Sequence, residues 1–156
     1  MIIRRAKPQD IDQILGLLSQ VLKTHATIRP DIFNDGTTKY RKEELEVMVA
    51  DDMNPIYVAT ECEEVLGYVF CQIRIDKHPH LLKRNKALYI DDFCVDEKQR
   101  RKHVGLTLFE YVKNEAIRLG CDEITLNSWV GNTPAEKFYE SLGFKPRSII
   151  MEYIIK

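Results

Sequence analysis

The stretch that decides the fold runs Tyr89-Ile90-Asp91-Asp92-Phe93-Cys94-Val95 and, after a polar turn, Arg100-Arg101-Lys102-His103-Val104-Gly105. Its first part is rich in aromatic and β-branched residues, which predicts a strand. Apolar residues then recur at helical spacing from Val104 to Leu119, and Gly120 follows as a helix terminator. A strand, a basic turn and a helix in this order can bind phosphate, because the first N–H groups of a helix lack internal partners and the helix dipole favours an anion there.

Upstream of this stretch the sequence predicts a strand at residues 2–6 and a helix from Ile11 to Leu22 behind Pro8. A loop at residues 28–36, containing Pro and Asn-Asp-Gly, divides that helix from a second one around Leu45 to Val49. Two β-rich runs then flank an acidic turn, which is typical of a hairpin, and they cover residues 56–60 and 65–73.

Downstream, the sequence predicts a strand at 123–127 and a helix that begins at Thr133 as its cap and closes at Gly143. The tail at 149–155 is predicted to be a last strand. The expected order is therefore β-α-α-β-β-β-α-β-α-β, an α/β fold with a mixed sheet, in a single domain over residues 1–156.

Composition narrows the function classes. The chain has 156 residues, a formal net charge of -1 and no apolar run approaching the ~20 residues of a membrane span. Its N-terminus turns charged at once, unlike a signal peptide, so we expect a cytoplasmic protein with no membrane partner. The balanced charge gives no overall attraction to nucleic acid. Any anion site must be local.

The four cysteines lie far apart, and none forms a Cys-x-x-Cys pair. This spacing argues against zinc and against disulfides, so we expect reduced thiols that behave as small buried apolar groups. No metal site is predicted.

The basic turn has two further interpretations. It can be a solvated basic face balanced by Asp96 and Glu97, or a patch that touches nucleic acid, although it lacks the interleaved aromatic residues of such patches. The turn alone does not choose between these and a phosphate cradle.

The segment from Arg100 to Gly105 resembles the coenzyme-A signature of GNAT acetyltransferases, Arg/Gln-x-x-Gly-x-Gly/Ala. Arg100 occupies its first position and Gly105 its last. His103 stands where the family usually has glycine, a residue that permits positive φ and a close approach of the backbone to pyrophosphate. Histidine is among the non-glycine residues better tolerated at positive φ, so we expect binding to survive.

The resemblance extends in both directions. Residues 89–95 are similar to the family's fourth strand, with a local likeness to diamine acetyltransferases, and residues 132–144 match its Asn-x-x-Ala-x-x-Phe-Tyr-x-x-x-Gly-Phe segment. Three motifs in this order are more specific than any one of them. They imply the GNAT fold and acetyl-CoA as the acyl donor.

Transfer of acetyl to an amine needs a base for the ammonium, an acid for the departing sulfur and a donor for the oxyanion. The resemblance implies that Asp91 or Asp92 is the base, with Asp91 at the usual Glu position, and that Tyr139 is the acid. Only one aspartate of an unbulged strand would face the acceptor, and a bulge would change the choice. By resemblance, the cofactor-binding residues are Phe93, Cys94, Val95, Arg100, Arg101, Lys102, His103, Val104, Gly105, Leu106 and Asn132.

The acceptor is expected to bind between the segment 25–35, the loop 76–86 and the strand that carries the two aspartates. We expect a small-molecule amine attacked directly in a ternary complex. A protein N-terminus or lysine is the alternative, as are a covalent route through Cys94 and a non-catalytic coenzyme-A sensor. A homodimer is compatible with the sequence, which does not fix the oligomeric state.

Overall fold

A five-stranded mixed sheet organises the chain. In the computed structural model, which describes residues 1–78 and 80–156, the strands lie side by side in sequence order. They are β1 (Ile2–Arg5), β2 (Ile56–Glu61), β3 (Glu64–Ile75), β4 (Lys86–Val95) and β5 (Glu123–Leu126). Neighbours from β1 to β4 pair antiparallel, whereas β4 and β5 pair parallel. The mixed α/β sheet expected from the sequence is confirmed.

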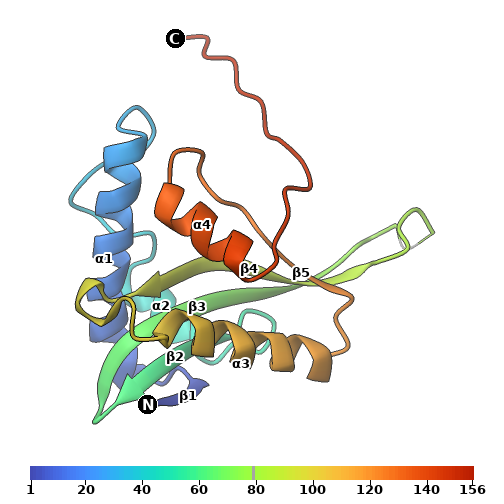
Figure 1. The fold of residues 1–156 in the computed structure, drawn as a ribbon. Helices are drawn as coiled ribbons and strands as arrows, with labels where there is room; N and C mark the ends of the chain where they lie inside the picture. The colour runs from blue at the N-terminus through green and yellow to red at the C-terminus, as the bar shows by residue number, and fades with distance from the viewer. Residues whose placement is uncertain (79) are drawn as a thin grey trace.

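Helices cover both faces of this sheet (Figure 1). On one face, α1 (Ile11–Ile28) and α2 (Lys42–Met48) form a buried cluster with Val58, Tyr68 and Phe70. On the other face, α3 (Val104–Arg118) packs on residues such as Leu88 and Ile90. The last helix, α4 (Thr133–Ser141), follows β5, and single 3-10 turns occupy Pro8–Asp10 and Glu97–Gln99.

A bulge interrupts β4 at Asp91. Opposite β3, Asp92 pairs with Phe70 and Ile90 pairs with Cys71, which leaves Asp91 as an extra residue. A bulge reverses the alternation of side chains along a strand. Accordingly, Ile90 packs under α3, whereas Cys94 lies in the cluster with α1.

The two parallel strands separate beyond the bulge. Their pairing ends where Ile90 meets Leu126, yet β4 continues to Val95. The edge of β4 from Asp91 to Val95 therefore has no β5 partner, and Figure 1 shows α4 lying over this part of the sheet. The unpaired edge of β4 is where the fold can offer strand backbone to an extended ligand.

Three expectations need correction. The tail predicted as a strand at 149–155 belongs to neither a strand nor a helix. Cys62 is exposed and Cys121 is half-buried, whereas all four cysteines were expected to be buried. The helix predicted to begin with Thr133 as its cap is capped by Asn132. Within the described residues, none of the helices is long and apolar enough to cross a membrane.

Candidate active site

Two aspartates at the bulge of β4 share one lysine. The Lys39 ammonium lies 2.8 Å from Oδ2 of Asp91 and 3.9 Å from Oδ2 of Asp92. It also donates to the backbone carbonyl of Asp91 at 3.0 Å. Because the bulge removes strict alternation, both adjacent carboxylates reach the same cation. An unbulged strand would direct only one of the two aspartates to this side, but the bulge allows both to face the lysine.

Two tyrosines complete the surroundings of the acids. The Tyr40 hydroxyl donates to Asp91 at 2.6 Å, and the Tyr68 hydroxyl lies 3.4 Å from Oδ1 of Asp92. The Asp92 side chain is only 7% exposed. Burial raises the pKa of Asp92 to about 6, with a further rise from the charge of Asp91 and an opposing effect of Lys39. A carboxyl with a pKa near neutrality is suited to accept a proton.

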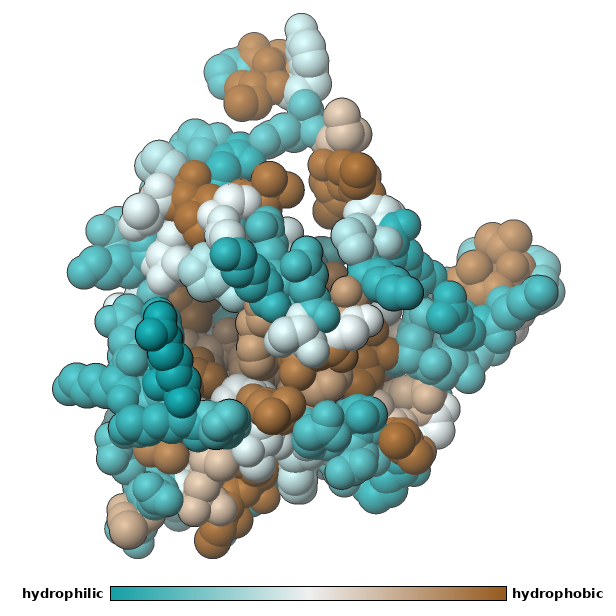
Figure 2. All heavy atoms as spheres, viewed as in Figure 1, coloured by the Kyte–Doolittle hydropathy of each residue, from teal (hydrophilic) through white to brown (hydrophobic). Residues whose placement is uncertain are grey.

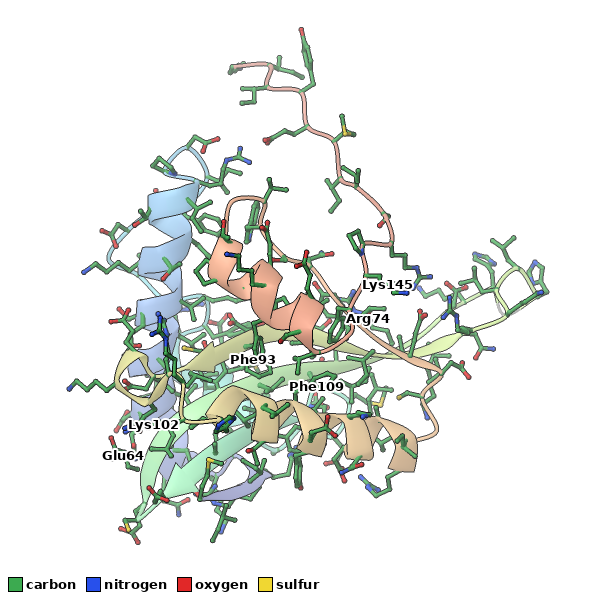
Figure 3. All side chains as sticks on the ribbon, in the orientation of Figure 1. Glu64, Arg74, Phe93, Lys102, Phe109 and Lys145 are labelled. Carbon is green, nitrogen blue, oxygen red and sulfur yellow. The ribbon has the colours of Figure 1, made fainter. Side chains whose placement is uncertain are left out.

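Tyr139 approaches the same region from α4. Its ring packs edge-on against Phe93 at a centroid distance of 6.4 Å and contacts Phe138 and Phe144. Burial raises the pKa of the Tyr139 phenol, and the charge of Asp92 raises it further. The phenol therefore stays protonated at neutral pH, but the raised pKa also makes it a weaker acid, so its position must assist any proton transfer to a departing sulfur. Figure 3 shows Phe93 between β4 and α4.

The turn before α3 presents free backbone N–H groups. Arg101 and His103 both have left-handed backbone, with φ of 63° and 62°. His103 is the N-cap of α3 but its side chain makes no capping hydrogen bond, and the first helical bond runs from Thr107 N to the His103 carbonyl. The N–H groups of Val104, Gly105 and Leu106 thus lack helical partners, as an anion site requires. The structure confirms that His103 adopts the positive φ expected of the family's glycine.

The basic side chains of this turn are exposed. Arg100 lies 4.0 Å from Glu97, and Lys102 bonds Gln99 at 3.0 Å, so neither is buried in a strong pair. Lys102 stands on the turn that precedes α3 (Figure 3). Such side chains can move to a phosphate without breaking the fold.

Gly105 allows α3 and α4 to approach each other. A Cβ at this position would lie 3.1 Å from Cζ of Phe138 and 3.5 Å from Cγ2 of Val95. The first turn of α3, the end of β4 and the helix bearing Tyr139 therefore meet at one residue without a side chain.

The residues after the bulge face opposite layers. Phe93 and Val95 pack on the side of α3, whereas Cys94 is buried on the side of α1, where its Sγ donates to the Leu17 carbonyl at 3.7 Å. Burial raises the pKa of Cys94 to about 12, and the charge of Asp92 contributes. A thiol held in this state is a poor nucleophile.

Asn132 has a structural task. Its side-chain oxygen accepts a hydrogen bond from Ala135 N at 3.4 Å and caps α4. The N-cap is therefore one residue before Thr133, the residue predicted from the sequence. Both residue types are good caps, and the sequence could not distinguish adjacent candidates. The side chain of Asn132 is half-buried.

Of the segments expected around the acceptor, one is close and one is not. Within 25–35, His25 and Phe33 form an aromatic cluster with Trp129. Burial lowers the pKa of His25, and the charge of Lys39 lowers it further. The loop 76–86, apart from Pro79, which lies outside the described residues, follows the far end of β3, where Ile75 pairs with Lys86. Figure 1 shows that hairpin end projecting away from α1.

The sequence reasoning missed Lys39, Tyr40 and Tyr68. Lys39 and Tyr40 stand in the unpatterned connection before α2, and no motif links them to acids 52 and 51 positions away. In the described part of the chain, no group of three or more His, Cys, Asp or Glu residues could hold a metal ion.

Comparisons with known proteins agree with this architecture. The sequence model of the Acetyltransferase (GNAT) family matches residues 19–144. The chain is 28% identical over 146 residues to N-alpha-acetyltransferase 30 of Xenopus laevis, covering 78% of this chain and 52% of that protein. It is 38% identical over 81 residues to the protein of that name from Dictyostelium discoideum, covering 52% and 40%. The chain spans about half the length of the curated relatives it matches.

Solved structures resemble the whole chain. A mutant of the BH1408 protein from Bacillus halodurans superposes with a TM-score of 0.92 at 28% identity, covering 100% of both chains. An aminoglycoside N-acetyltransferase in complex with CoA superposes with a TM-score of 0.73 at 18% identity, covering 99% of both. The latter likeness concerns the fold alone. Because the family's sequence model spans most of the chain, from the middle of α1 to the end of α4, this protein belongs to the GNAT acetyltransferase family.

Proposed function

We propose that the chain is an acetyl-CoA-dependent N-acetyltransferase whose acceptor is a cationic primary amine. The observation that carries the proposal is the Lys39 ammonium on Asp91 and Asp92, beside the helix that bears Tyr139. A primary ammonium is already accommodated there by two carboxylates and a backbone carbonyl. An acceptor ammonium can take the same partners when Lys39 swings aside, since the Lys39 side chain is 40% exposed.

The donor site fits coenzyme A on two observations. The uncapped N-terminus of α3 offers N–H groups to a pyrophosphate, and exposed Arg100, Arg101 and Lys102 surround it. The unpaired edge of β4 beyond Asp91 offers backbone groups to an amide-containing arm. Acetyl-CoA, when bound, supplies the electrophilic thioester carbon, and by family resemblance the N–H groups around Phe93, Cys94 and Val95 polarise its carbonyl oxygen.

Asp92 is proposed as the base. Its buried carboxyl, with a pKa of about 6, is ionised at neutral pH yet more basic than an ordinary aspartate. Asp91, which accepts hydrogen bonds from Lys39 and Tyr40, would instead hold the ammonium in place. The base is therefore Asp92 in this proposal, whereas the resemblance to the family favours Asp91, which occupies the position of the usual Glu.

Tyr139 is proposed as the acid. Its phenol keeps its proton because burial and the nearby negative charge of Asp92 both raise its pKa. The phenolic O–H can then donate to the departing sulfur as the amine nitrogen forms its bond to carbon. Direct attack is favoured over a route through Cys94, whose thiol remains protonated at neutral pH.

Two acceptor classes have support. A small cationic amine fits the paired acids, and we put it first. A peptide N-terminus is the second candidate, because the relatives at 28% identity and above include proteins named N-alpha-acetyltransferase 30. Both present a primary amine to the same carboxylates, so the chemistry at Asp92 and Tyr139 would be shared.

The test measures thiol release from acetyl-CoA with polyamines, aminoglycosides, amino acids and short peptides with free or blocked N-termini. At least one amine is expected to give turnover that Tyr139→Phe and Asp92→Asn each reduce tenfold or more. Lys42→Ala serves as the control, since Lys42 pairs with Asp12 and makes no ion pair with Asp91 or Asp92. Acetyl-CoA should raise the unfolding temperature of every variant.

Three results would contradict the proposal in separate ways. Absence of any thermal shift with acetyl-CoA would refute the donor site. Turnover that is unchanged in both variants would refute the assigned roles. Turnover restricted to peptides with free N-termini would make the second acceptor class the correct one.

A further inference from the structure

A cavity lined by three arginines lies where the start of β5 meets the far end of the β3–β4 hairpin. It has a volume of about 220 Å³, and its lining includes Arg74, Arg84, Glu123, Thr125 and Arg147. Figure 2 shows hydrophilic residues along this hairpin, and Figure 3 labels Arg74 where the hairpin leaves the body of the molecule. None of these side chains takes part in the chemistry proposed for Asp92 and Tyr139, so they lie outside the site already described.

Positive charge is in excess in this cavity. Glu123, which is only 15% exposed, pairs with both Arg84 and Arg147. Because Arg147 keeps Glu123 paired, the 64% exposed side chain of Arg84 can turn toward a ligand. Asp76 also lines the cavity, but its carboxylate accepts a hydrogen bond from a backbone N–H of its own turn. Within the described residues, Arg74 makes no salt bridge to any carboxylate, so its charge is available.

Stacking holds the guanidinium of Arg74 in a fixed plane. Its central carbon lies 3.3 Å from the centroid of the Tyr89 ring. Its Nε and Nη2 both donate to Oε1 of Gln72, at 3.1 and 2.7 Å. These two neutral partners orient the group without cancelling its charge, and Nη1 makes no hydrogen bond within the described residues. A planar, oriented guanidinium with free N–H groups is suited to bind a carboxylate.

The arginine cavity and the two aspartates share one face of the sheet. Phe70 is buried on the side of α1, and Cys71 on the side of α3. Because side chains alternate along a strand, Arg74 lies on the same face as Phe70. Asp92 pairs with Phe70 and so shares this face. Arg74 follows Phe70 by four positions, which places the arginine about 13 Å from the acids at ~3.3 Å per residue.

The sheet face between Asp92 and Arg74 has no buried contact with α1 or α2. The buried cluster formed by those helices includes Tyr68 and Phe70 of β3 but no later residue of that strand. Gln72 is half-buried and Arg74 is exposed. This part of the face carries paired carboxylates at one end and arginines at the other. A ligand that lies along it therefore meets opposite charges at its two ends.

We propose that the acceptor carries a carboxylate about 13 Å from its amine, and that Arg74 and Arg84 bind this group. The inference rests on the proposed function, since it places the acceptor amine at Asp91 and Asp92. An extended peptide advances about 3.5 Å per residue, so a peptide with an acidic fourth residue has the required length. A linear ω-amino acid of matching length presents the same two charges. The shared chemistry is an elongated amine with an anionic far end.

The experiment compares acceptors that differ only in this charge. One pair is the tetrapeptide amides Ser-Gly-Gly-Glu and Ser-Gly-Gly-Gln, and the other is the ω-amino acid and its amide. In at least one pair, kcat/KM should be about tenfold higher for the acid, because a charge-assisted hydrogen bond forms. The gain should appear in KM, since the bond lies away from the reacting atoms. A preference in the first pair identifies a peptide as the source of the carboxylate, and in the second pair a small molecule.

Arg74 variants test whether the cavity causes the preference. Arg74→Gln should abolish the preference and leave the rate with the neutral acceptor unchanged. Arg74→Glu should reverse it, so that Ser-Gly-Gly-Lys amide becomes a better acceptor than the Glu peptide. Arg118→Gln is the matched control, because Arg118 is an exposed arginine that pairs with Glu115 on α3. This control should keep the preference. Unfolding temperatures should stay close to that of the parent, since Arg74 is exposed.

Calorimetry separates this inference from the proposed function. Binding of both pairs is measured in the presence of coenzyme A, which requires no turnover. The favoured acid should bind about tenfold more tightly than its amide in the parent, and equally in Arg74→Gln. A binding preference without any turnover would support the arginine site and refute the proposed enzyme. A preference that survives Arg74→Gln would overturn the inference. So would equal rates and equal binding within both pairs, and turnover in that case would leave the proposed function standing.

Discussion

Lys39 and Asp91 form a salt bridge of 2.8 Å that joins the connection before α2 to the bulge in β4. The same ammonium is 3.9 Å from Asp92, whose carboxyl is buried. Lys39 therefore balances the negative charge of two adjacent acids, and its removal should raise the pKa of Asp92.

Lys39→Ala should move the acidic limb of kcat/KM to higher pH. The positive charge of Lys39 lowers the pKa of Asp92, so its loss raises that pKa, and the base becomes ionised only at higher pH. We expect a shift on the order of one pH unit from a limb near 6 in the parent. Rates measured from pH 5 to pH 9 with one amine would test this. Lys42→Ala should leave the limb in place, and an equal shift in both variants would contradict a local effect of Lys39.

Asp92→Asn should stabilise the protein at neutral pH while it removes activity. Below the ordinary aspartate value of 3.8, Asp92 is protonated in both the folded and unfolded states. Between 3.8 and about 6 only the folded protein keeps the proton, so stability falls as pH rises through this window, and the loss is complete above it. Asn avoids this loss, which is about 3 kcal/mol for a rise in pKa from 3.8 to about 6. Urea unfolding at several pH values should give a gain that is present at pH 8 and shrinks toward pH 4. A gain of equal size at all pH values would refute the ionisation argument.

His103→Gly should relieve backbone strain at the cofactor turn. A left-handed conformation costs a residue with a Cβ about 1–2 kcal/mol, and glycine avoids that cost. We expect a stability increase of about 0.5–1 kcal/mol by chemical denaturation, since glycine also gains entropy when unfolded. Acetyl-CoA should bind at least as tightly. His103→Ala removes the imidazole without relieving φ and should bring no gain. Clear loss of acetyl-CoA affinity in both variants would mean that the imidazole contacts the ligand.

Two glycine-to-alanine changes should differ in their effect on stability. Gly16 lies in α1 with nothing within 4 Å of an added Cβ, so Gly16→Ala should stabilise by about 0.8–1 kcal/mol through helix propensity. Gly105→Ala would bring a Cβ to 3.1 Å from Phe138, and we expect the crowding to cancel or exceed that gain. Because Phe138 contacts Tyr139, the rate of thiol release should also fall in Gly105→Ala alone. Equal stabilisation by both changes would show that α4 can shift to accommodate the added Cβ at no cost in stability.

Local patterns were sufficient to predict most elements. Periodicity predicts α1, α3 and the β2–β3 hairpin, and the family motif places His103 at a glycine position, where the structure shows a positive φ. These features depend on neighbouring residues, which a sequence displays directly.

Features that depend on distant partners were not predictable. The bulge at Asp91 is a property of the pairing between β3 and β4, so counting along β4 could not find it. The contacts of Lys39 and Tyr40 with the acids join segments that share no motif. The tail has the composition of a strand, but composition does not say whether its own sheet contains a place for it.

The bulge in β4 also fixes how the site balances its charge. A regular strand offers one carboxylate to a given side at this point, whereas the extra residue supplies two in succession. Two adjacent anions in a buried setting are costly unless something positive joins them. The pair is thus kept near a net charge of -1 by any one of three occupants: the ammonium of Lys39, a proton on Asp92 or an incoming amine. Entry of the acceptor then becomes an exchange of one cation for another.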